Sequence, residues 1–413
     1  MRRLVVLAAA LAALWASPGA WAAGWCGSGV ATTDRPDAVT GAQVHAIYAT
    51  PADGPDNFAA VANALADDTA AIDVWWRGQD PARTLRFDLA TFPACVGLDV
   101  TFARLPRTGP SIAAEGVRGY GAIVEQIATL GYLHPFKRYL VYYDGPTSRS
   151  SICGTASGRF ELGPSTAVIW VYACDDAPHD YVAAHELLHA LGAAPPGAPH
   201  TCGVDDTGHV CDSPLDILQP RVSGMPLVEE VLDVGRDDYY GHSGSWRDIQ
   251  DSIWLRRLDV SQHRLSIAFQ GSGRVTTDLP GLDCTSACAA DWDAGSLVTL
   301  TAEGTARTRF LRWRGACTGD LDCVLAINGA RTVTAVFGPT RVSVRVTASG
   351  RGRVACSPRC SSSFRAGTSL TLRAVAAPGW RFVRWTGACA GTRAVCRPAT
   401  NFAVAARAVF RRR

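Results

Sequence analysis

The C-terminal part of the chain contains the same segment twice, and this repetition restricts the fold more than any other feature. Residues 271–337 and 350–410 share, in the same order, a Gly-x-Gly-Arg-Val run, a Cys-x3-Cys pair, a Trp-x-Gly-Ala-Cys run and a final Ala-Val-Phe. Between these landmarks lie short alternating runs of β-branched residues. The pattern predicts two small all-β modules of about 65–70 residues each.

Each copy contains four cysteines, namely Cys284, Cys288, Cys317 and Cys323 in the first and Cys356, Cys360, Cys389 and Cys396 in the second. Domains this small rarely fold on hydrophobic burial alone, so we expect two disulfides in each. Pairing within each close pair is preferred among the three possible connectivities. The whole pattern resembles the divergent internalin-type B-repeat, a β-grasp-like module of bacterial surface and secreted proteins. The resemblance implies repeats at residues 270–338 and 341–410.

The N-terminus has the features of a secretory signal peptide. Two arginines follow Met1, an apolar run covers residues 4–15, and Ala20-Trp21-Ala22 offers the small-x-small cleavage pattern. We therefore expect residues 1–22 to be removed near Ala22. No later apolar stretch is long enough to form a transmembrane helix. The mature protein is expected to be secreted, extracellular or periplasmic, where its 14 cysteines would form disulfides.

Residues 23–265 mix helix and strand patterns and predict an α+β domain. Strands are expected at residues 44–49, 84–89, 98–105, 139–143 and 167–173, and helices at 56–71, 111–130 and 179–191. Six cysteines lie in this domain, and fifteen pairings are open to them. The simplest set pairs them sequentially, as Cys26–Cys95, Cys153–Cys174 and Cys202–Cys211.

One motif in this domain carries chemistry. His185-Glu186-Leu187-Leu188-His189 places two imidazoles at positions i and i+4 of a predicted helix, so that both reach one metal ion. Zn²⁺ bound by three protein ligands lowers the pKa of its water to about 7, and a neighbouring carboxylate takes the proton as that water attacks a carbonyl. Glu186 is the expected general base.

The sequence leaves the third zinc ligand open. His200 and His209 are equal candidates: His200 is nearer the Gly192 turn in a Pro-rich loop, and His209 lies nearer the Asp216-Ile-Leu218 segment and inside a possible Cys202–Cys211 loop. Asp212 and Asp216 are weaker alternatives. A structural zinc site built from both histidines with Cys202 and Cys211 is a rival interpretation that an oxidising compartment disfavours.

Several elements together resemble secreted bacterial metzincin-like zinc proteins: Tyr139-Leu-Val-Tyr-Tyr-Asp-Gly145, Cys153-Gly154, His185 to Gly192, Ala198-Pro-His200, Gly208-His209 and Asp216-Ile-Leu218. The resemblance implies a metzincin-like fold, a zinc cofactor and hydrolysis of peptide bonds in a protein or peptide substrate. The chain departs from the pattern at two positions. Pro195 stands where the third ligand is expected, and Leu218 stands where the family has a Met, although Leu keeps an apolar floor of similar volume.

Charge is distributed unevenly along the chain. The net charge is +3, yet residues 340–413 contain 15 Arg and no Asp or Glu. This segment is a candidate for binding an anionic envelope or matrix polymer, and nothing in the chain indicates a specific nucleic acid partner. A second functional class therefore stays open: a non-enzymatic surface or secreted binding protein, with adhesive repeats and a silent peptidase-like scaffold.

Overall fold

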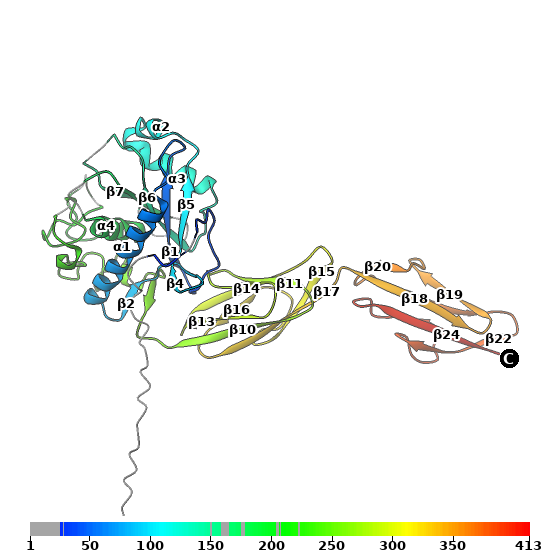
Figure 1. Cartoon of the computed structure of the whole chain (residues 1–413). Coiled ribbons are helices and arrows are strands. Elements are labelled where there is room, and N and C mark those ends of the chain that lie inside the picture. Colours follow the sequence, from blue (N-terminus) through cyan, green and yellow to red (C-terminus); the bar gives the residue numbers. More distant parts are fainter. Residues whose placement is uncertain are drawn as a thin grey trace, which may run out of the picture. The chain divides into compact units, whose positions relative to one another are not determined.

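The computed structural model describes residues 25–27, 29–148, 151–157, 165–174, 178–203, 206, 208–221 and 224–413 (Figure 1). The chain divides into two compact units, of which the first contains Ala42–Asp259 and the second contains Val260–Arg413. The boundary thus lies a few residues before the one expected at residue 265. The predicted signal peptide, residues 1–22, lies outside the described residues.

The N-terminal unit combines helices and strands, as predicted. In chain order its elements are β1 (Gln43–Thr50), α1 (Phe58–Gln79), β2 (Arg83–Leu85), β3 (Leu89–Thr91), β4 (Val96–Leu98), β5 (Val100–Arg104), α2 (Gly109–Ala113), α3 (Gly119–Thr129), β6 (Lys137–Tyr143), β7 (Gly154–Ala156), β8 (Ser165–Trp170), α4 (His179–Leu191) and β9 (Leu255–Arg257).

The central sheet of this unit has five strands in the order β5-β1-β6-β8-β7. The first four are parallel, whereas β7 pairs antiparallel with β8 and forms one edge. Every residue of β1, β6 and β8 is buried, because both faces of the sheet are covered. Alternate strand residues pack with α1 and α4 on one face and with α2 and α3 on the other.

The sequence patterns located most of these elements. Helix α4 spans the predicted residues 179–191, and α1 extends beyond the predicted end at residue 71 because the buried Trp75 and Trp76 continue its apolar side. The prediction of a single helix at residues 111–130 is wrong. It is two helices, α2 and α3, with Gly116 between them at a φ of 58°. The strand expected at 84–89 is likewise interrupted, and only its ends belong to β2 and β3.

Both C-terminal repeats are all-β, as predicted. The first contains β10 (Gln262–Gln270), β11 (Gly273–Thr277), β12 (Asp283–Cys284), β13 (Cys288–Asp293), β14 (Leu297–Gly304), β15 (Thr308–Gly315), β16 (Cys323–Ala326) and β17 (Arg331–Pro339). The second contains β18 (Arg341–Ser349), β19 (Gly352–Ser357), β20 (Ser363–Arg365), β21 (Thr371–Ala376), β22 (Trp380–Gly387), β23 (Val395–Cys396) and β24 (Val404–Arg412).

Each repeat consists of two sheets that share one core. In the first repeat the sheets are β13-β10-β17-β15 and β12-β11-β14-β16, and in the second they are β20-β18-β24-β22 and β19-β21-β23. Inward residues of both sheets enter a single hydrophobic cluster in each repeat. The β-grasp-like arrangement expected of the repeats is replaced by this two-sheet packing, because residues 262–413 contain no helix to lie against a sheet.

Seven disulfides connect all 14 cysteines, which lie within the described residues. The sequential pairing predicted for the N-terminal unit is confirmed, as is pairing within each close pair of both repeats. In the described part of the chain, no helix is long and apolar enough to cross a membrane.

Candidate metal centre

Helix α4 places the side chains of the His-Glu-x-x-His motif in the interior of the N-terminal unit. The helix packs against β7, β8 and α1, and His185 and Glu186 are less than one tenth exposed. It ends at Gly192, whose φ of 89° lets the chain turn sharply away from the helix axis. The histidines are one helical turn apart, and their Nε2 atoms lie 3.1 Å from each other.

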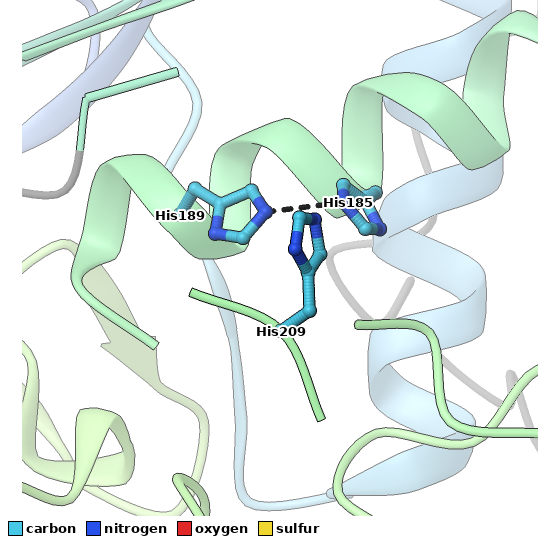
Figure 2. A group of neighbouring side chains, drawn as sticks. All are labelled: His185, His189 and His209. Carbon is cyan, nitrogen blue, oxygen red and sulfur yellow. Dashed lines mark hydrogen bonds between the residues drawn. The ribbon is translucent and has the colours of Figure 1, made fainter. Parts of the chain in front are cut away.

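The third histidine of the site comes from a short ribbon that follows this turn. Thr201 pairs antiparallel with Val210, and the Cys202–Cys211 disulfide joins the two sides of the ribbon. His209 thereby faces the helix, with its ring centre 4.9 Å from that of His189 and 5.3 Å from that of His185. Figure 2 shows the three imidazoles converging from α4 and the facing loop. One ring nitrogen of each lies within 4.8 Å of the others.

His200, the other candidate ligand, lies elsewhere. Its Nδ1 is 3.0 Å from Oδ2 of the buried Asp238, and its backbone N–H donates to the other oxygen of that carboxylate. It groups with Asp212, Asp237 and Asp238 and not with the two helical histidines. The expectation that His200 serves as a zinc ligand is therefore wrong, because its ring is committed to this acidic cluster. The rival structural site fails for a related reason, since both of its cysteines are consumed in a disulfide.

Hydrogen bonds hold two of the three imidazoles in the tautomer that a metal needs. Nδ1 of His185 donates to the carbonyl oxygen of Ile217 at 2.6 Å, and Nδ1 of His209 donates to Oδ1 of Asp206 at 2.7 Å. In a neutral imidazole, a proton held at Nδ1 by such a bond leaves Nε2 free for coordination. Partners of this kind orient ligating histidines and raise their basicity.

Burial favours the neutral form of the helical histidines. Burial first, and then the nearby His209, lower the pKa of His185 to about 4. The pKa of His189 is well below its usual value, first because of burial and then because of the other two histidines. His185 and His189 are thus neutral at neutral pH, and hydrogen bonds fix the orientation of His185 and His209. Together the three imidazoles match the donor set of a catalytic zinc site.

Glu186 lies beside the histidines in a non-polar environment, and burial raises the pKa of its carboxyl group to about 8. The backbone of β7 passes directly over this side chain. A Cβ atom placed on Gly154 would lie 2.4 Å from Cγ and 2.7 Å from Oε1 of Glu186. Only glycine fits there without displacing the carboxylate. The sequence contains a Cys-Gly pair at this position but no signal that Gly154 touches Glu186.

A cavity of about 580 Å³ opens onto the three histidines and Glu186. Its walls come from residues 151–156 around β7, from α4, and from the turn after α4, where Ala193, Ala194 and Pro196 lie. No other strand pairs with the free side of β7 among the described strands. The cavity therefore combines an extended backbone edge with a mixed polar and apolar wall next to the histidine cluster.

Leu218, which stands at the position of the expected Met, is fully buried in the same core cluster as Leu188 of α4. Its backbone carbonyl accepts from Val210, next to His209, and its backbone N–H donates to Asp216. Asp216 also accepts from Tyr239 and from the N–H of Val234, so it supports the loop and does not join the histidine group. Leu218 is thus an apolar support behind both ligand-bearing segments.

Comparisons with known proteins concern mainly the C-terminal part of the chain. A family model described as the divergent InlB B-repeat domain matches residues 265–341 and 342–410, so the two C-terminal modules are B-repeat domains. No curated protein matches the chain. Among solved structures, the major pilin protein (T-13) from Streptococcus pyogenes serotype GAS131465 is similar over 37% of this chain and 96% of its own. The identity is 6% and the TM-score 0.15, which carries no argument.

The B-repeats, together with the seven disulfides, indicate an extracellular or cell-surface protein. Disulfides persist in oxidising compartments and are rare where thiols are kept reduced.

Proposed function

We propose that the N-terminal unit is a metzincin-like, zinc-dependent peptidase, secreted after removal of the signal peptide near Ala22. The observation that carries this proposal is the convergence of His185, His189 and His209 at one point, with the buried Glu186 beside them in an open cavity. Two neighbouring histidines on a helix are a common accident. Here a third histidine comes from a ribbon closed by a disulfide, and an acidic residue lies at the same point. An accidental grouping of these four side chains is much less plausible than an accidental pair.

A zinc ion held by the three histidines would supply a Lewis acid and a water of lowered pKa. The positive charge of such an ion would offset the burial that raises the pKa of Glu186, so the ionised carboxylate is placed to accept the proton of the attacking water and to deliver it to the departing amine nitrogen. The absence of a side chain at Gly154 leaves the space that the Glu186 carboxylate occupies. The hydrogen bonds from His185 and His209 keep the imidazoles in a fixed orientation.

The edge strand β7 is the proposed docking site for substrate. A peptide in extended conformation adds readily to an unpaired strand edge, where backbone hydrogen bonds supply affinity with little dependence on sequence. Because β7 passes over Glu186, a peptide paired with it would place a carbonyl carbon close to the histidine cluster. The substrate class is therefore a protein or peptide with an exposed extended segment.

The test combines metal analysis with proteolysis. Purified mature protein should contain about one zinc per chain and should hydrolyse casein. Glu186→Gln should abolish hydrolysis while keeping the zinc, and His209→Ala should lose both. His200→Ala is the matched control, because this histidine is on the same ribbon but outside the cluster, and it should retain zinc and activity. Absence of zinc, or activity that is indifferent to Glu186→Gln, would contradict the proposal.

The competing class is a non-enzymatic binding protein in which the repeats act and the N-terminal unit is silent. The family match is compatible with this class, because the match covers the two repeats and not the N-terminal unit. This class predicts no hydrolysis of any protein substrate, even when the three histidines are saturated with zinc.

A further inference from the structure

The second B-repeat is unusual in its charge. All 15 arginines of residues 340–413 are exposed, and the same residues include no Asp or Glu to neutralise them. A charge of this density repels itself and contributes nothing to folding. Its distribution over the surface therefore calls for a physical explanation.

Strand alternation places nearly half of these arginines on one face of one sheet. In β18 and β24 the inward residues are small or apolar, and the outward residues alternate with them. The outward face of β20-β18-β24-β22, which we call the arginine face, carries seven exposed arginines: Arg341, Arg345, Arg365, Arg381, Arg384, Arg407 and Arg411.

Two pairs of these arginines lie directly opposite each other on neighbouring strands. Arg341 is the register partner of Arg365, and Arg381 is the register partner of Arg411. Like charges at such positions destabilise a sheet. The arrangement therefore costs stability in the free protein, and a bound polyanion would relieve that cost.

The arginine face is also hollowed. A shallow depression of about 520 Å³ is lined by Arg345 and Arg407, with Thr347 and Thr386 beside them and Ala405 among its other lining residues. Two guanidinium groups and two hydroxyl-bearing side chains thus surround one recess. Guanidinium groups bind carboxylate and phosphate groups through paired hydrogen bonds.

The equivalent sheet of the first repeat, β13-β10-β17-β15, has a less basic outward face. Arg309 and Arg312 on β15 occupy the positions of Arg381 and Arg384, whereas the positions on β10 and β17 differ. Ile267 pairs with Val333 there, as Val346 pairs with Ala406 in the second repeat, so Ser266 corresponds to Arg345 and Thr334 to Arg407. An arginine on the same sheet of the first repeat, Arg264, is paired with Asp291 at 3.2 Å. The basic face is therefore not required by the fold.

We propose that the arginine face binds a linear acidic polysaccharide. A regular polymer with one carboxylate per sugar unit fits guanidinium groups that repeat along neighbouring strands, and the threonine hydroxyls suit the hydroxyl groups of the sugar. Nucleic acid fits less well, because the outward positions of these four strands carry no aromatic side chain on which a base could stack, and Trp385 and Phe410 are buried on the opposite side of the sheet. The binding is electrostatic and weakens as salt concentration rises.

The test uses the full mature chain and polygalacturonate as the probe. Arg345→Ser with Arg407→Thr, which introduces the residues of the first repeat, should weaken binding at low salt roughly tenfold or more, because neighbouring contacts to one polymer reinforce each other. The matched control removes the same charge from exposed arginines of the other sheet, by Arg353→Ser with Arg373→Thr, and should lower affinity less than threefold.

Three results would overturn the proposal. Equal weakening by both double variants would mean that only net charge matters and that the arginine face is not a site. No weakening by the first variant would exclude the face directly. Tighter binding of double-stranded DNA than of polygalacturonate, at equal charge concentration and salt, would assign the face to nucleic acid instead. Unchanged melting temperatures of both variants verify that the repeat is folded, and the peptidase activity of the N-terminal unit does not enter the measurement.

Discussion

Replacing Gly154 by alanine tests whether the strand above Glu186 controls the position of the catalytic carboxylate. The added Cβ would lie 2.4 Å from Cγ of Glu186, whereas carbon atoms in contact are normally about 3.5–4.0 Å apart. The Glu186 side chain or the strand must therefore move by about 1 Å. Misplacement of a reacting group by that distance can reduce a rate about 100-fold. We expect kcat/KM for a peptide substrate to fall by this factor.

Zinc binding should survive the substitution, because the atoms nearest to the new Cβ all belong to Glu186 and not to the three histidines. The assay therefore measures kcat/KM and zinc affinity on the same preparation. Gly121→Ala in α3, where no atom lies within 4 Å of the new Cβ, is the control for the substitution itself and should leave both quantities unchanged.

A second variant makes the test specific. Glu186→Asp withdraws the carboxylate from the position that the new Cβ would occupy, so the loss caused by Gly154→Ala should be much smaller in the Asp background. Activity of Gly154→Ala within threefold of the parent, or a loss that is fully additive with Glu186→Asp, would refute the argument that Gly154 positions this acid.

Three further predictions concern metal binding and stability. Cys202→Ser with Cys211→Ser opens a loop of nine-residue separation, whose closure is worth about 2.7 kcal/mol, so zinc affinity should fall by up to about 100-fold in a competition titration. Chelation of zinc present at about 100 times its dissociation constant should lower the calorimetric melting temperature of the N-terminal unit by about 5–10 °C and leave the repeats unaffected. Burial raises the pKa of Asp68 to about 7, although a hydrogen bond from Tyr142 lowers it. The stability that protonated Asp68 contributes is therefore lost as the pH rises from about 4 to about 7. Over this interval the melting temperature of Asp68→Asn should rise relative to that of the parent protein. Asp67→Asn, at the exposed neighbouring position, should show no such rise.

The sequence predicted the parts of the site that depend on local periodicity. Helix α4 and the relation of His185 to His189 follow from 3.6-residue spacing, and the pairing of Cys202 with Cys211 and of the close cysteine pairs in both repeats follows from their short separations. The choice between His200 and His209 does not follow, because it is decided by a long-range contact. Asp238 lies 38 residues beyond His200 and captures its ring.

The contact between Gly154 and Glu186 is also a long-range contact that local sequence does not predict. Strand β7 is short and pairs with β8 across a segment of chain that gives no periodic signal, so nothing local indicates that its backbone covers α4. The break between α2 and α3 is not predicted for a different reason. The interruption at Gly116 depends on a left-handed backbone conformation, and the many glycines of this chain do not differ in sequence in a way that identifies which of them adopt it.

The two repeats separate the residues that determine the fold from those available for function. Trp313 and Trp385 occupy equivalent buried positions and both repeats end in a buried Phe, so the inward residues retain their type. The outward positions change from Ser266 to Arg345 without altering the strand pairing. Because side chains alternate between the two faces of a strand, the outward face can change its charge while the core remains the same. The net charge of +3 therefore conceals two B-repeats of one fold with different surfaces, of which the second has 15 exposed arginines and no acidic residue, whereas the first contains Asp and Glu as well as Arg.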